Sequence, residues 1–427
     1  SPLFETIVEY IPAPEGDPEA DTQMLISTID YNEYVGRIGI GKIDNGSLKV
    51  NQECVIVNHH DPDKMRRVKI GKLYEFDGLN RVEVSSATIG AIVAITGIPE
   101  IHIGDTLCSP EHPEAIPFQK ISEPTISMNF MVNDSPLAGQ EGKYITSRHL
   151  RDRLFRELNT DVSLRVEETD SPDCFKVSGR GELHLSVLIE NMRREGFEFA
   201  VSKAEVIYKY DERNRKLEPM ELAYVDVPEE YSGSVIQKLT SRKGELQGMS
   251  PANGGYTRLE FAIPSRGLIG YRGEFMTDTK GNGILNTIFD GYAPFKGELS
   301  YRKNGSLIAF EAGESITYGL FNAQERGTLF IGPGVKVYSG MVVGECPRSE
   351  DIELNVCKTK KLTNTRSSSA DEALKLTPPK EMSLEQCLDF IDTDELLEVT
   401  PKNLRIRKKI LDPTMRKRSS LNKKSLG

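Results

Sequence analysis

The stretch "YVGRIGIGKID", residues 34–44, decides between two very different folds. Gly36, four further residues and Gly41-Lys42 reproduce most of the phosphate-binding loop of nucleotide triphosphatases. That loop continues with Ser or Thr, whose hydroxyl binds magnesium at the start of a helix. Here Ile43 follows, and then Asp44-Asn45-Gly46, in which Asn-Gly is a strong hairpin signal. The stretch therefore predicts a glycine-rich hairpin of a β-barrel and not a nucleotide site.

The surrounding residues support the barrel. Residues 24–108 contain short β-branched runs such as "MLISTI", "CVIVN" and "AIVAIT", separated by turn residues. Other GTPase elements are missing from the sequence: residues 278–281, "DTKG", imitate a metal-binding DxxG, but no NKxD base-reading motif occurs. Catalytic patterns such as GxSxG or HExxH are also absent. Glu182 and His184 stand at i and i+2, where side chains on a helix face apart, so they predict no acid–base pair.

From residue 123 onward the periodicity predicts two α+β domains in tandem. An extended run, a helix, two strands, a helix and a strand follow one another up to residue 208, and the same order starts again after "YDERNRK" at 210–216. The order βαββαβ is that of a ferredoxin-like domain. We expect two helical faces to be buried, one with Leu150, Leu154, Phe155 and Leu158, the other with Leu183, Val187, Leu188 and Met192.

The second of these domains contains a segment with unusual glycine spacing, "SRGLIGYRGEFM" at 265–276, which we expect to be one helix. Gly267, Gly270 and Gly273 each cost a helix about 1 kcal/mol relative to Ala. Two explanations remain open: close packing of the helix on its own sheet, or close approach to a large partner whose phosphates meet Arg266 and Arg272.

Beyond residue 297 the pattern is mainly strand-like, with short helices. A polar loop, "CKTKKLTNTRSSSADEA" at 357–373, precedes a helix that begins with a capping box of Ser383 and Gln386. The segment "NLRIRKKIL" at 403–411 fits either a short helix or a strand.

Composition and charge narrow the function. The 427 residues are 38% hydrophobic and 28% charged, with no apolar run long enough for a membrane span. The start of the sequence lacks the basic and apolar segments of a secretory signal, which favours the cytoplasm. Six scattered cysteines predict reduced, mostly buried thiols, and His59-His60-Asp61 predicts a solvated hairpin tip more than a metal site.

The net charge of −10 is distributed unevenly. Residues 401–427 carry ten Lys or Arg against Asp412 alone, a balance of +9, so the other 400 residues sum to −19. Such asymmetry indicates that a basic end docks onto a polyanion, although a disordered tail is the alternative. We predict RNA contacts by twelve cations: Lys358, Lys360, Lys361, Arg366, Arg405, Arg407, Lys408, Lys409, Arg266, Arg272, Arg242 and Lys243.

Several long segments resemble a known family. "VGRIGIGKIDNGSLKVNQECVIV" at 35–57 resembles the second-domain barrel of translational GTPases, and residues 179–208 and 218–249 resemble the third and fifth domains of elongation factor G. The fourth domain of that factor is absent, as in the BipA (TypA) and LepA families. Residues 265–299 and 382–411 resemble BipA, so that the likeness spans essentially the whole chain.

The resemblance implies a domain plan: residues 1–22 a connector, 23–117 the barrel, 118–208 and 209–297 the two ferredoxin-like domains, and 298–427 a family-specific RNA-binding domain. It further implies a piece of a ribosome-dependent GTPase that lacks the G domain, with GTP and Mg²⁺ bound by that missing domain and no cofactor here. The expected partners are the ribosome, with its rRNA, tRNA and ribosomal proteins. We expect a cytoplasmic monomer that acts in stress adaptation and large-subunit assembly.

Two alternatives stay open at this point. A LepA-type elongation factor differs from BipA only in the C-terminal half. A metabolite-sensing protein is the alternative from another class, since tandem ferredoxin-like domains often hold small ligands between them.

Overall fold

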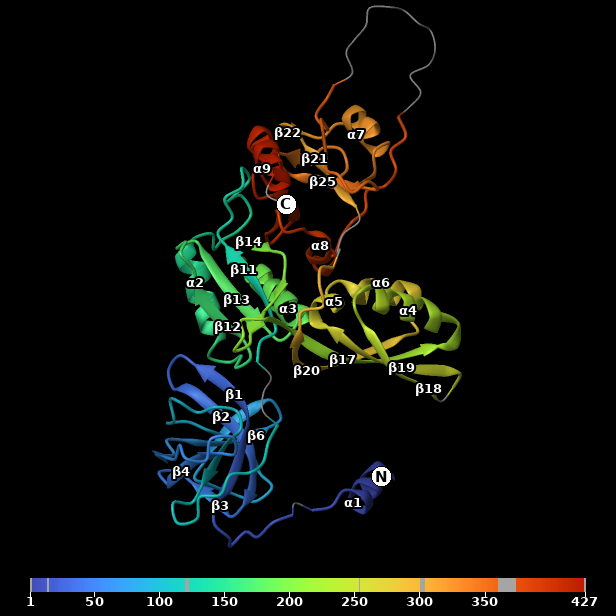
Figure 1. Cartoon of the computed structure of the whole chain (residues 1–427). Helices are drawn as coiled ribbons and strands as arrows, with labels where there is room; N and C mark the ends of the chain where they lie inside the picture. Colours follow the sequence, from blue (N-terminus) through green and yellow to red (C-terminus); the bar gives the residue numbers. More distant parts are fainter. Residues whose placement is uncertain are drawn as a thin grey trace, which may run out of the picture. The chain divides into compact units, whose positions relative to one another are not determined.

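The computed structural model describes residues 2–13, 15–119, 123–252, 254–299, 304–359 and 374–425. Its contacts divide the chain into two compact units, which are described separately: residues 1–122 with 153–164, and residues 123–152 with 165–427. Figure 1 labels the helices and strands for which there is room. Among the described helices, none combines the length and apolar character needed to cross a membrane.

The first unit holds one exposed helix and a β-barrel. The helix is α1 (Pro2–Tyr10), none of whose residues is buried. The strands are β1 (Gln23–Asn32), β2 (Gly36–Asn45), β3 (Ser47–Lys49), β4 (Glu53–Asn58), β5 (Arg66–Lys69), β6 (Leu73–Asp77), β7 (Asn80–Val84), β8 (Ser86–Thr88), β9 (Ile92–Ile95) and β10 (Asp105–Cys108).

Eight of these strands form one antiparallel sheet in the order β5-β4-β10-β1-β2-β9-β6-β7. The sheet curls around a single core, because Met24, Ile43, Ile56, Leu73 and Leu107, from five of the strands, belong to one buried cluster. The predicted barrel is confirmed, and residues 36–45 form one of its strands, β2.

The predicted hairpin turn at Asp44-Asn45-Gly46 is wrong. β2 pairs with β1 and β9, whereas β3 after Gly46 pairs with β8. Gly46 has φ +68°, and a Cβ there would come within 2.5 Å of the carbonyl oxygen of Ala20. The dipeptide therefore redirects the chain into a second, small sheet, and its glycine serves a close backbone approach.

Close packing also explains the glycines that imitate a phosphate loop. A Cβ on Gly41 would lie 2.0 Å from the carbonyl oxygen of Leu25, and one on Gly39 would lie 2.5 Å from Cδ1 of Ile101. The register between β1 and β2 shifts between Ile26 and Thr28, next to this contact. Such irregularities bend a strand at a barrel wall.

The second unit begins with a ferredoxin-like domain. Its elements are β11 (Ile126–Met131), α2 (Ser147–Glu157, which crosses into the residues assigned to the first unit), β12 (Arg165–Glu168), β13 (Cys174–Gly179), α3 (Glu182–Arg194), β14 (Phe199–Ser202) and β15 (Glu205–Val206). The strand order β12-β13-β11-β14 is that of the predicted fold.

Only part of the predicted helical faces is correct. Leu150 and Leu154 are buried, as expected. In α3 the side chains of Leu183 and Val187 are 58% and 51% exposed, and the buried face consists of Leu185, Leu188, Ile189 and Met192. Because α3 is apolar on two sides, periodicity alone could not choose between them.

A second ferredoxin-like domain follows. Its elements are β16 (Lys209–Tyr210), β17 (Lys216–Pro228), α4 (Glu229–Ser241), β18 (Glu245–Ala252), β19 (Tyr256–Pro264), α5 (Ser265–Leu268), α6 (Tyr271–Asp278) and β20 (Ile284–Pro294). β17 lies between β19 and β20, and β18 lies at the edge beyond β19. The helices cover one face of this sheet (Figure 1).

The glycine-rich segment in this domain is not one helix. It breaks between α5 and α6, where Gly270 has φ +70°. A Cβ on Gly267 would lie 2.5 Å from the carbonyl oxygen of Arg242, so this glycine allows α5 to pack on its own domain.

The remaining chain forms small sheets and short helices. These are β21 (Gly305–Ala309), β22 (Gly313–Glu314), α7 (Thr317–Gln324), β23 (Thr328–Leu329), β24 (Lys336–Val337), β25 (Val342–Cys346), β26 (Ile352–Leu354), α8 (Leu384–Phe390), β27 (Glu395–Val399), β28 (Leu404–Lys408) and α9 (Pro413–Ser425). The capping box of Ser383 and Gln386 is present at the start of α8.

The C-terminal strands complete a sheet begun much earlier in the chain. β27 pairs with β14, and β28 pairs with β27, so the first ferredoxin-like sheet continues as β12-β13-β11-β14-β27-β28. The segment "NLRIRKKIL" is thus largely a strand.

The packing of Gly41 gives a test of the barrel. Gly41→Ala places a methyl group against backbone that no side-chain rotation can move, and we expect it to destabilise the barrel by about 2 kcal/mol. Gly233→Ala, in α4 with open space around its Cβ, is the matched control and should be neutral or stabilising by up to about 1 kcal/mol. Urea unfolding measures both, and equal effects would contradict the proposed role of Gly41.

Candidate nucleic-acid interface

Of the four cations predicted to contact RNA at residues 405–409, Arg407 and Lys408 are buried, and the side chain of Arg405 is 9% exposed. Arg405 pairs with Glu141 and lies 3.4 Å from Glu398, and Arg407 pairs with Asp134 and is 1% exposed. Lys408 is 3% exposed. Arg405 and Arg407 hold the C-terminal strands onto the first ferredoxin-like domain, and Lys408 pairs with carboxylates of the C-terminal part itself. We therefore revise the prediction of direct RNA contact for all three.

Glu398 lies at the centre of this network. Its side chain is fully buried, accepts a hydrogen bond from the hydroxyl of Tyr338, and faces both Arg405 and Arg407. Burial raises the pKa of Glu398, and the two guanidiniums oppose that rise. A carboxylate in this position needs nearby cations, because an unpaired buried charge is strongly unfavourable.

Lys408 serves a second buried cluster. Its Nζ lies 3.0 Å from Asp394, 3.0 Å from Glu395 and 2.5 Å from Asp351. Burial alone lowers the pKa of Lys408, but Glu395, Asp394 and Asp351 together raise it above its usual value. The lysine therefore stays charged and joins β28 to β27 and to the loop before β26.

Arg266 and Arg242 also have structural roles. Arg266 is 3% exposed, pairs with Glu218 and donates to the carbonyl oxygen of Gly297 at 2.6 Å. Arg242 donates to the carbonyl oxygens of Gly267 and Ile269, both at 3.0 Å, and so fixes the break between α5 and α6. The predicted phosphate contact of Arg266 is wrong, since its guanidinium is enclosed.

The other predicted cations lie at the surface or outside the described residues. Lys409, Arg272, Lys243 and Lys358 are exposed. Lys360, Lys361 and Arg366 lie outside the residues that the structure describes. These four exposed cations come from four different segments: Lys243 follows α4, Arg272 lies in α6, Lys358 follows β26 and Lys409 follows β28.

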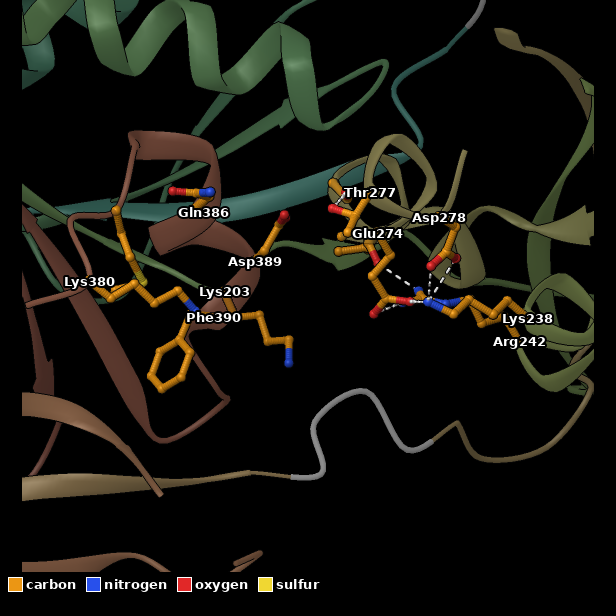
Figure 2. A pocket seen from close by; sticks show the side chains of 14 residues that line it. Lys203, Lys238, Arg242, Glu274, Thr277, Asp278, Lys380, Gln386, Asp389 and Phe390 are labelled. Carbon is orange, nitrogen blue, oxygen red and sulfur yellow. Dashed lines mark hydrogen bonds and ion pairs between the residues drawn. The ribbon is translucent and has the colours of Figure 1, made fainter. Parts of the chain in front are cut away.

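A cavity of about 400 Å³ lies where α6, α8 and the end of β14 meet. Figure 2 shows Lys238 and Arg242 beside Glu274 and Asp278 on one side, and Asp389 with Gln386 and Phe390 from α8 on the other. Lys203 and Lys380 complete the charged lining. The acids and bases of the α6 side neutralise one another, with Lys238 2.8 Å from Asp278 and Arg242 3.0 Å from Glu274.

Two carboxyl groups meet next to this cavity. Asp389 in α8 is hydrogen-bonded to Glu182 at the start of α3, and Glu182 also accepts from the backbone N–H of Gly270 at 3.2 Å. Burial, the charge of Glu182 and the hydrogen bond between them raise the pKa of Asp389 to about 8, against the opposing effect of Arg242. The pair therefore holds a proton near neutral pH and links three domains.

No local sequence pattern indicates this pair. The nearby His184 suggests a local partner for Glu182, whereas its actual partner, Asp389, lies about two hundred positions later. Of the possible metal ligands His59, His60 and Asp61, His60 has a partner within the protein: one of its ring nitrogens lies 2.9 Å from the carbonyl oxygen of Phe118. Within the described residues, no three His, Cys, Asp or Glu side chains are grouped as metal ligands. The six cysteines are free thiols, four of them buried.

Three protein-family models match the chain. They are the TypA/BipA C-terminal domain at 304–413, the elongation factor G C-terminus at 215–303 and elongation factor Tu domain 2 at 36–108.

Curated relatives named large ribosomal subunit assembly factor BipA match nearly the whole chain, and three of them serve as examples. The protein of Synechocystis sp. is 50% identical over 95% of this chain and 68% of its own length. That of Salmonella typhimurium is 50% identical over 99% of this chain and 70% of its own length. That of Haemophilus influenzae is 52% identical over 98% of this chain and 68% of its own length.

The buried network predicts unequal roles for neighbouring cations. Arg407→Ala leaves Glu398 buried beside one cation fewer, and we expect a loss of about 3–5 kcal/mol in the free energy of unfolding. Lys409→Ala, two residues later at the surface, should change it by no more than about 0.5 kcal/mol. Urea unfolding followed by circular dichroism compares them. If the two variants are equally stable, Arg407 does not neutralise Glu398.

The shared proton predicts a pH dependence of stability. The folded pKa of Asp389, about 8, is above the value of about 3.9 in an unfolded chain, so the folded state binds more protons between these two values. The contribution of Asp389 to stability is complete below about pH 4 and is lost as the pH rises through 8. Asp389→Asn cannot titrate, so the melting temperature of the variant should rise relative to wild type between pH 5 and 8.5.

Asp226→Asn is the matched control for this pH series. Asp226 pairs with Arg258 at the surface, and the hydrogen bond from Arg258 lowers its pKa, so it stays ionised throughout this range. The difference between this variant and wild type should be constant from pH 5 to 8.5. A constant difference for Asp389→Asn as well would rule out the shared proton.

Proposed function

The chain belongs to the TypA/BipA family, and we propose that it is the ribosome-binding part of a translational GTPase that acts in assembly of the large ribosomal subunit. The observation that carries this proposal is the match of 95–99% of the chain to proteins named as large-subunit assembly factors. The TypA/BipA match at 304–413 lies in the half that distinguishes this family from LepA, so the LepA alternative is not favoured. No observation favours the metabolite sensor.

Binding to the ribosome proceeds, in this proposal, through phosphates of rRNA and tRNA. The exposed cations Lys409, Arg272, Lys243 and Lys358 support it, since lysine and arginine at the surface of an acidic protein are the groups that phosphate attracts. The loop cations Lys360, Lys361 and Arg366 belong to the same set. We place the protein in the cytoplasm with the ribosomes, as a monomer, and assign it a role in stress adaptation.

Nucleotide chemistry is assigned to a G domain and not to these residues. GTP and Mg²⁺ need the hydroxyl of a phosphate loop, and residues 34–44 offer an alkyl side chain within a barrel strand.

The loop at 357–373 provides the first test. Changing Lys358, Lys360, Lys361 and Arg366 to Ala should weaken co-sedimentation with 70S ribosomes. If all four contact phosphates, the slope of log affinity against log salt should become shallower by roughly 3. The matched control changes Lys42, Lys49, Arg67 and Lys69, four exposed barrel cations, and removes the same charge. Equal losses in both variants would show that general charge and not this loop binds the ribosome.

The nucleotide assignment has a separate test. The chain of 427 residues should show no saturable binding of GTP in the presence of Mg²⁺ by equilibrium dialysis and no GTP hydrolysis with ribosomes. Saturable GTP binding that Lys42→Ala abolishes would contradict the assignment of residues 34–44 to a purely structural role.

A further inference from the structure

A second cavity, of about 440 Å³, lies on the outer face of the first ferredoxin-like sheet. Ser127 and Asn129 of β11 point into it, and they alternate with Met128 and Phe130, whose side chains are buried in the domain. Thr393 and Lys409 from the C-terminal strands line it as well. We refer to this cavity as the sheet groove. Its floor is polar, as expected for the solvent-facing side of an antiparallel sheet.

An irregularity in the sheet places a lysine at the side of the groove. β14 and β15 both pair with β11, but the register shifts by one residue between them, and Lys203 lies in the interruption. Bulges of this kind redirect a side chain and occur often beside functional sites. Lys203 lines both this groove and the first cavity, its side chain is 11% exposed, and its Nζ is 3.4 Å from Asp392.

Three lysines converge on the groove from two domains. Lys176 comes from β13, Lys203 from the bulge and Lys409 from the position just after β28, whereas Glu205 is the only carboxylate in the described lining. Lys176 forms no ion pair with any described residue. Lys409 donates to the carbonyl oxygen of Thr393, which leaves its charge unmatched by a carboxylate. A positive, polar groove on a chain of net charge −10 favours an anionic ligand.

An aromatic ring lies at one end of the same groove. Tyr208 lines it, and its ring is held by Lys216, 3.7 Å from the ring centroid, and by Phe295, 5.9 Å away between centroids. A fixed aromatic ring beside a row of cations is the combination by which proteins bind single-stranded nucleic acid, with bases on the ring and phosphates on the lysines.

From this arrangement we infer that the sheet groove binds a short single-stranded segment of RNA. Lys176, Lys203 and Lys409 contact its phosphates, Ser127, Asn129 and Thr393 offer hydrogen bonds, and Tyr208 stacks with a base. The inference rests on the proposed ribosome binding and deepens it by naming a contact surface outside the loop at 357–373. The ligand that we infer is a loop or an end, because a base that stacks on Tyr208 has to be free of the stack of a duplex.

The test uses the full chain and a fluorescently labelled hexauridylate. The double variant Lys176→Ala/Lys409→Ala should bind it at least tenfold more weakly in fluorescence anisotropy. Its slope of log affinity against log salt should be shallower by roughly 1.4, which is 0.7 for each lost phosphate contact on a single strand. The control Lys42→Ala/Lys49→Ala removes the same charge from the barrel and should change neither quantity.

A variant with increased affinity provides a second test, because misfolding would lower the affinity and would not raise it. Glu205→Gln removes the carboxylate from the groove and should tighten hexauridylate binding several-fold. A duplex of the same length should bind more weakly than the single strand to the wild-type chain. If the double variant binds like wild type, or if Glu205→Gln has no effect, the inference is overturned.

Ribosome co-sedimentation separates this inference from the proposed function. If the wild-type chain and the Lys176→Ala/Lys409→Ala variant bind 70S ribosomes with equal affinity, the groove is not a ribosomal contact. The proposed function then still stands. If the wild-type chain binds neither ribosomes nor hexauridylate, the proposed function itself fails.

Discussion

The buried carboxylate of Glu398 constrains the whole C-terminal part of the protein. Its charge has to be matched inside the fold, and the cations that match it, Arg405 and Arg407, come from the one segment whose positive charge is most conspicuous in the sequence. The Tyr338 hydroxyl adds a hydrogen bond from the small sheets that precede it. As a result, the strands β27 and β28, the loop that carries Glu141 and the body of the C-terminal part are held together by one charge network, and each depends on the others.

These internal ion pairs reduce the number of cations in residues 401–427 that are available to an external ligand. A count of +9 over residues 401–427 suggests a polyelectrolyte arm, but Arg405, Arg407 and Lys408 pair with carboxylates of the fold. Lys409 is the next residue along, and its exposure makes it available to a ligand. The two lysines therefore have opposite roles because strand alternation and the end of the pairing with β27 separate them, not because their chemistry differs.

Much of the architecture could be predicted from the sequence, because it follows from local periodicity. The barrel, the two βαββαβ repeats and the capping box at Ser383 all have local signals. The incorrect predictions concern features that depend on tertiary contacts. They are the partner strand of Ser47–Lys49, the choice between two apolar faces of α3, and the burial of Arg266 against Glu218, 48 positions away. The pair of Glu182 and Asp389 is likewise a contact between residues far apart in the sequence. A single sequence reports residue types and spacings, and it does not report which charges meet across domains.

The pairing of β14 with β27 also has a consequence for how the chain is made. Phe199 aligns with Val399, 200 positions later, so the ribosome synthesises a complete ferredoxin-like domain long before its neighbouring strand exists. At 5–20 residues per second, β14 waits roughly 10–40 s as an open sheet edge. Open edges invite pairing with other chains. On a polysome, where several nascent chains lie close together, β14 is therefore open to intermolecular pairing until β27 covers it.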